Sequence, residues 1–67
     1  MGLRYILVEK YKAGYHVVSA FQPQYLKAYK DNVKEYLQNG TIEWYRLYTT
    51  DTENLIEDVN QLKKEYP

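Results

Sequence analysis

The stretch LRYILVEKYKAGYHVVSAF, residues 3–21, decides the fold of this 67-residue chain. Residues 3–11 and 15–21 are rich in β-branched and aromatic side chains, which favour extended strands. Between them, Gly14 supplies the positive φ angle that a short hairpin loop requires. The stretch therefore predicts an antiparallel hairpin at the start of the chain.

A helix is predicted after the hairpin, because Pro23 suits a first helical turn and Asn39-Gly40 supplies a left-handed end. At 100° per residue its apolar stripe has two flanks. The aliphatic flank holds Leu26, Val33 and Leu37, and the aromatic flank holds Tyr25, Tyr29 and Tyr36. Charged residues occupy the opposite arc. We expect the aliphatic flank to face the core and the tyrosines to lie at its rim.

A third strand and a second helix are predicted in the remaining chain. Alternation over residues 41–50 places Ile42, Trp44, Arg46 and Tyr48 on one face and residues such as Tyr45 and Leu47 on the other. Thr50 and Glu53 match a capping box for the helix that follows. One face of that helix is apolar, and it carries Leu55, Ile56, Val59, Leu62 and Tyr66.

The predicted element order is β-β-α-β-α in a single α+β domain spanning residues 1–67. A right-handed crossover through the first helix places strand 3 beside strand 1. We therefore expect a three-stranded antiparallel sheet of order 2-1-3, with two helices on one face, as a two-layer sandwich. The second face of the sheet would then be bare and open to a partner or a second copy.

The chain has an excess of tyrosine, with nine among its 67 residues. Tyrosine joins an apolar ring to a hydroxyl that needs a partner, so a small domain cannot bury them all. Tyrosine, tryptophan and arginine are also the residues that anchor protein interfaces. The third strand combines these types, and its candidate partner-binding residues are Trp44, Arg46, Tyr48, Ile42 and Tyr45.

Charge is unevenly distributed although the net charge is zero. Residues 1–30 carry +4 and residues 31–67 carry −4. A sheet with exposed aromatics and a basic hairpin suggests an alternative function, stacking unpaired bases and contacting phosphates. Its candidate residues are Arg4, Lys10, Lys12, Tyr11 and Tyr15. The neutral net charge disfavours this alternative, since phosphate neutralisation supplies much of the affinity for nucleic acid.

The sequence offers no recognisable catalytic or metal-binding constellation. It has no cysteine, and its single histidine, His16, lies on the opposite strand face from Ser19. The acids Asp51, Glu53, Glu57 and Asp58 gather at a helix start, where the helix dipole alone accounts for them. The longest apolar run is too short to span a membrane. We expect no enzymatic activity, no cofactor, no metal and a cytoplasmic location.

These observations lead to a non-enzymatic protein-interaction module as the expected function. We expect a homodimer, or a small inhibitor or regulator, that docks through an aromatic sheet face or a strand edge. Small cysteine-free β-β-α-β domains are common among phage-encoded inhibitors of host enzymes, so a phage or mobile-element origin fits by fold-level analogy.

Overall fold

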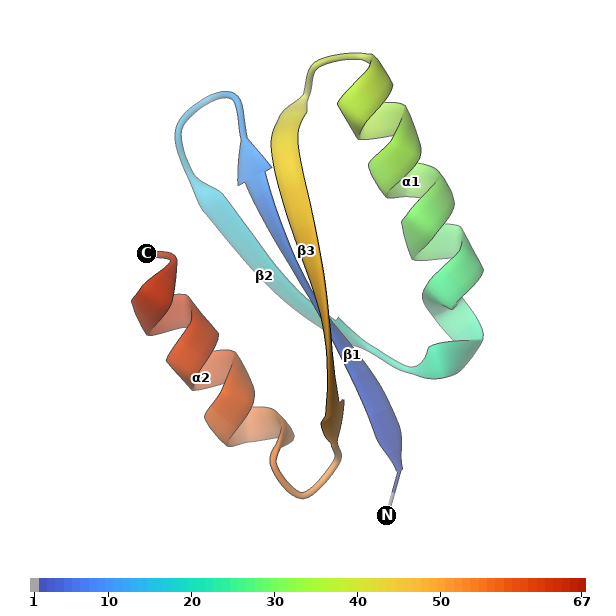
Figure 1. Ribbon diagram of the computed structural model, residues 1–67, viewed down its shortest axis with the longest axis vertical. Helices are drawn as coiled ribbons and strands as arrows, with labels where there is room; N and C mark the ends of the chain where they lie inside the picture. Colours follow the sequence, from blue (N-terminus) through green and yellow to red (C-terminus); the bar gives the residue numbers. More distant parts are fainter. Residues whose placement is uncertain (1) are drawn as a thin grey trace.

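The computed structural model describes residues 2–67 and confirms the predicted element order and sheet topology (Figure 1). The three strands form one antiparallel sheet of order β2-β1-β3. The fold class is therefore α+β, as the sequence predicted. The elements are β1 (Leu3–Tyr11), β2 (His16–Phe21), the short 3-10 helix η1 (Pro23–Tyr25), α1 (Leu26–Gln38), β3 (Ile42–Asp51) and α2 (Leu55–Glu65).

The two helices cover opposite faces of the sheet, so the prediction of both helices on one face is wrong. Leu7 of β1 packs with Val33 of α1, whereas its neighbours Ile6 and Val8 pack with Leu62 of α2. Consecutive strand residues point to opposite faces, so the sheet lies between α1 and α2 (Figure 1). The physical reason is that the central strand is apolar on both sides and each side needs a cover. The molecule has three layers, and neither sheet face is bare.

A β-bulge changes the face to which Ile42 points. Lys10 pairs with Trp44 and Tyr11 pairs with Ile42, which leaves Glu43 as an extra residue on β3. Ile42 is consequently buried in the core on the α1 side, while Trp44 packs in the cluster on the α2 side. The prediction that Ile42 shares a face with Trp44 is therefore wrong, because simple alternation does not anticipate the extra residue.

Two glycines act where the sequence placed them. Gly14 has a φ of 109° in the hairpin loop, and its N–H donates to the Tyr11 carbonyl at 2.9 Å. Gly40 has a φ of 79° just beyond α1, where Thr41 donates from its N–H to Asn39 Oδ1 at 2.9 Å. The predicted hairpin and the predicted helix end are both confirmed.

The predicted capping box at the start of α2 does not form. Thr50 belongs to β3, and its buried hydroxyl donates to Asp58 Oδ2 within α2. The N-cap of α2 is Asn54, which makes no side-chain capping bond. Thr50 therefore links the end of β3 to the side of α2.

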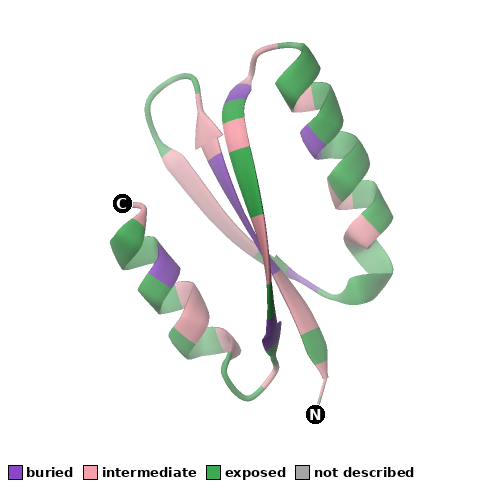
Figure 2. Ribbon diagram, viewed as in Figure 1, coloured by how far each residue is buried: buried purple, intermediate pink, exposed green. Residues whose placement is uncertain are grey.

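The helices pack lightly against the sheet. Only Val33 of α1 and only Leu62 of α2 are buried, whereas β1 has a buried run from Ile6 to Glu9 (Figure 2). Among residues 2–67, no helix has the length and apolar character needed to cross a membrane. The core is thus centred on one strand, and large parts of both helices and of β3 remain accessible.

Candidate functional site

Trp44, Arg46 and Tyr48, three of the predicted partner-binding residues, pack around Tyr66 just beyond α2. Arg46 Nη1 donates to the Tyr66 hydroxyl at 2.6 Å, and the guanidinium carbon lies 5.2 Å from the centroid of the Trp44 ring. The Tyr48 and Tyr66 hydroxyls are 3.5 Å apart. The hydrogen bond to Tyr48, followed by burial, raises the pKa of the Tyr66 hydroxyl. These residues hold the end of the chain against the sheet.

His16 completes this cluster from β2. Its ring centroid lies 5.6 Å from that of Trp44 and 5.4 Å from that of Tyr66. Its Nδ1 is 3.2 Å from the carbonyl oxygen of Pro67. The aromatic face that the sequence placed open to a partner is therefore occupied by the molecule's own C-terminal residues.

The opposite side of β3, which faces α1, carries a concavity. A groove of about 300 Å³ runs between α1 and β3. Leu7 and Leu47 of the sheet and Val33 of α1 line it, and Tyr45 stands at its rim with 44% of its surface exposed. Tyr45 is the predicted partner-binding residue that the structure leaves most clearly available on this side.

The groove lies where side chains of α1 do not fill the space above β3. On the β2 side, the Tyr29 ring stacks on Phe21 with centroids 3.9 Å apart, and Tyr36 meets Tyr11 edge-on at 6.2 Å. The stacked Phe21 and Tyr29 rings form one end of the groove, and Leu37 and Leu47 also line it. Leu37, which we expected in the core, is 40% exposed there.

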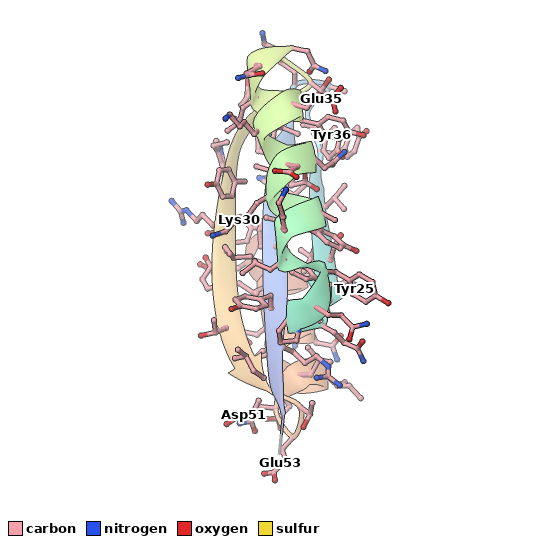
Figure 3. All side chains as sticks on the ribbon, turned by 90° about the vertical axis from the view of Figure 1, so that its right-hand side faces the viewer. Tyr25, Lys30, Glu35, Tyr36, Asp51 and Glu53 are labelled. Carbon is pink, nitrogen blue, oxygen red and sulfur yellow. The ribbon has the colours of Figure 1, made fainter. Side chains whose placement is uncertain are left out.

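The two sides of α1 carry different kinds of side chain, aromatic on one side and basic on the other (Figure 3). Figure 3 shows Tyr25 and Tyr36 projecting from one side of α1 and Lys30 from the other. Lys30 and Lys34 both line the groove. Lys27 lies 3.0 Å from Asp31, an exposed ion pair that contributes little. Lys30 and Lys34 form no ion pair among the described residues, so the groove has a basic lip.

β3 forms one edge of the sheet beside this groove. It is ten residues long, whereas the other edge strand, β2, has six. Proteins protect edges with proline, charged side chains and bulges. β3 contains no proline or lysine, and its bulge at Glu43 lies near one end, so the stretch from Trp44 to Thr50 remains a regular edge. A long edge with unpaired backbone groups and an apolar groove alongside is the arrangement that accepts an added strand.

Glu9 carries a buried carboxyl group, which the sequence alone did not indicate. It lies opposite Val17 and Tyr45 in the sheet and is only 6% exposed. Its Oε2 has no hydrogen-bond partner in the structure. Burial raises the pKa of Glu9, and burial followed by the charge of Glu9 raises the pKa of Tyr11. The charged carboxylate is therefore a cost to the fold rather than a support.

The residues proposed for nucleic-acid binding do not form one patch. Arg4 lies six residues from Lys10 along β1, which corresponds to about 20 Å of extended strand. Tyr11 and Tyr15 stack on each other with centroids 4.9 Å apart, and Lys12 is exposed in the adjacent loop. The hairpin thus keeps a small basic and aromatic tip, without Arg4.

The structure shows no candidate metal centre in residues 2–67, where no three potential ligands gather. The sequence indicated the aliphatic flank of the first helix but not the groove beside it, because the groove depends on which sheet face each helix covers. Comparisons with protein-family models, curated proteins and solved structures found no match.

Proposed function

We propose that this protein is a binding module that takes up a protein strand along the edge of β3 and in the neighbouring groove. The observation that carries the proposal is the combination of a ten-residue edge strand with an apolar groove of about 300 Å³ beside it. Backbone pairing would supply affinity, and side chains entering the groove would supply selectivity. No catalytic step is part of the proposal.

The aromatic residues of β3 divide between two roles in this proposal. Tyr45 contacts the partner directly, because its half-exposed ring stands at the groove rim. Trp44 and Tyr48 act from the other face, where they pack against α2 and keep β3 rigid. A preformed edge loses little conformational freedom on binding, and this favours affinity. An inhibitor or regulator of a larger protein is one form that such a module takes.

Selection of peptides from a random library tests this proposal. The baits are the wild-type protein, Tyr45→Lys at the groove rim, and the matched control Ile56→Lys on α2, where Ile56 is 76% exposed. We expect peptides that bind wild type and the control equally and bind Tyr45→Lys at least about tenfold more weakly, a difference of about 1.4 kcal/mol.

The location of binding provides the second readout. Amide chemical shifts of residues in β3 and α1 should change when a selected peptide is added, while those of α2 should remain unchanged. Peptides that bind Tyr45→Lys as tightly as wild type, or that perturb α2 instead, would show that the groove is not the binding site.

A further inference from the structure

Resting on the proposed function, we infer that the strand taken up by β3 is the β3 strand of a second copy of this chain. The two β3 strands would pair antiparallel across a two-fold axis perpendicular to the sheet. The three strands of each protomer would then join into one continuous sheet. Both copies of α1 lie on one face of that sheet, and both copies of α2 lie on the other.

The edge of β3 meets the requirement that a two-fold interface be self-complementary. An antiparallel pair centred on Leu47 matches the strand with itself, so that Tyr45 lies opposite Thr49 of the copy. On the other face, Arg46 lies opposite Tyr48 of the copy, beside the aromatic cluster. The regular part of β3, from Trp44 to Thr50, therefore pairs with the same residues of the copy.

Charge complementarity favours a second copy over an unrelated strand. Beyond the bulge, the residues of β3 that share a face with Tyr45 and Leu47 end in Asp51, and Glu43 lies at the strand's other end. This gives the strand acids near both ends and an apolar centre. The groove that would receive it has the opposite charge, with Lys30 and Lys34 at its lip.

The chain directions bring these charges together. Because α1 leads into β3 through a short turn, the C-terminal half of α1 lies beside the start of β3 (Figure 1). Antiparallel pairing brings the end of the copy's β3 to that same place. Asp51 of the copy thus arrives below Lys34. Lys34 also offsets the repulsion between that Asp51 and Glu43, which this register sets opposite each other.

Pairing also covers apolar surface that the isolated chain exposes. Tyr45 and Leu37 are 44% and 40% exposed, and both line the groove on its open side. A strand added along β3 would close that side with its own Tyr45 and Leu47. Apolar burial and ion pairing therefore act on the same face.

The mass of the protein in solution tests the inference first. Sedimentation equilibrium of wild type from micromolar to millimolar concentration should give twice the 8.1 kDa of one chain at the upper end. Added salt should shift this equilibrium toward monomer, since the ion pairs lie at an accessible rim. A monomer throughout this range would overturn the inference.

Charge reversal identifies the surface. The variants Lys30→Glu/Lys34→Glu and Glu43→Lys/Asp51→Lys should each self-associate at least about tenfold more weakly than wild type, whereas mixing them should restore a mixed dimer with all pairs reinstated. The matched control reverses Lys63 and Lys64 on α2 and should dimerise as wild type does. All these positions are exposed, and circular dichroism verifies folding. If either variant misfolds, glutamine replaces the original residues at the same two positions, with a smaller expected loss.

The outcomes separate this inference from the proposed function. A wild-type monomer that still selects peptides on β3 retains the binding module and rejects the second copy. A dimer that both charge variants leave intact, or that mixing fails to restore, also rejects the β3 pairing. If only the reversal of Lys63 and Lys64 on α2 weakens the dimer, and no peptide is selected on β3, both the β3 pairing and the proposed function are rejected.

Discussion

Replacing Glu9 with glutamine should stabilise the protein at neutral pH. The carboxyl group of Glu9 is buried between Val17 and Tyr45, and Oε2 has no hydrogen-bond partner. Burial penalises the charged form and raises the pKa of Glu9 above its ordinary value of 4.5. Glutamine has nearly the same shape and no charge, so Glu9→Gln isolates the cost of the carboxylate.

The sign of the pH dependence follows from this raised pKa. Below the ordinary pKa of glutamic acid, the side chain is protonated in both folded and unfolded chains and imposes no charge penalty. As the pH rises from that value through the raised pKa of the folded state, the unfolded chain ionises more readily. Folding stability of the wild type therefore falls over this window. Above it the full penalty remains.

The size of the effect comes from the cost of an unsatisfied buried polar group, about 1–3 kcal/mol. Glutamine keeps polar atoms at the same position, so the net gain should be near the lower end, about 1 kcal/mol. In a domain of this size, 1 kcal/mol shifts the midpoint of thermal unfolding by about 4–8 °C.

Thermal unfolding of wild type and Glu9→Gln at pH 4 and pH 7 measures this difference. The variant should unfold at a higher temperature at pH 7, and the difference should shrink toward zero at pH 4. Glu35→Gln on the exposed surface of α1 is the matched control and should change stability by no more than about 0.5 kcal/mol. A variant that is destabilised equally at both pH values would refute the reasoning, because the carboxylate would then have a stabilising partner.

Three further predictions concern other parts of the molecule. Gly40→Ala should destabilise the fold by about 1 kcal/mol in urea unfolding, because a φ of 79° strains any residue with a side chain; an unchanged midpoint would contradict the role of Gly40 in ending α1. Thr50→Val should cost about 1–2 kcal/mol in the same assay, because it leaves Asp58 without its hydroxyl donor; adding Asp58→Asn should recover part of that loss, and no recovery would contradict a role for this bond. A labelled single-stranded oligonucleotide should not bind tightly at low salt, since Arg4 lies far from the hairpin tip; tight binding with a steep salt dependence would revive that function.

The local structure of this chain was predictable from sequence because periodicity and turn residues act over short distances. The hairpin around Gly14 and the helix end at Gly40 follow from backbone sterics alone. The face that each helix covers depends on tertiary packing. The continuous apolar run Ile6-Leu7-Val8 is typical of a strand that is buried on both faces, and it is the sequence signal that one helix covers each face.

The candidate site was only partly predictable for a related reason. Tyr45 could be named as a surface aromatic on the strand. Ile42 could not be placed correctly, because one extra residue at the bulge reverses its direction. The groove is lined by residues of α1 together with residues of all three strands, so it is visible only once α1 lies on the sheet.

The packing of Tyr66 over Trp44 has a practical consequence for following the last helix. Trp44 is the single tryptophan of the chain, and its ring meets that of Tyr66 at 5.7 Å. Its fluorescence therefore reports the docking of α2, while far-ultraviolet circular dichroism reports the whole backbone. Small proteins can open one segment at a time. If α2 detaches before the sheet unfolds, the tryptophan signal will change at a lower denaturant concentration than the circular dichroism signal.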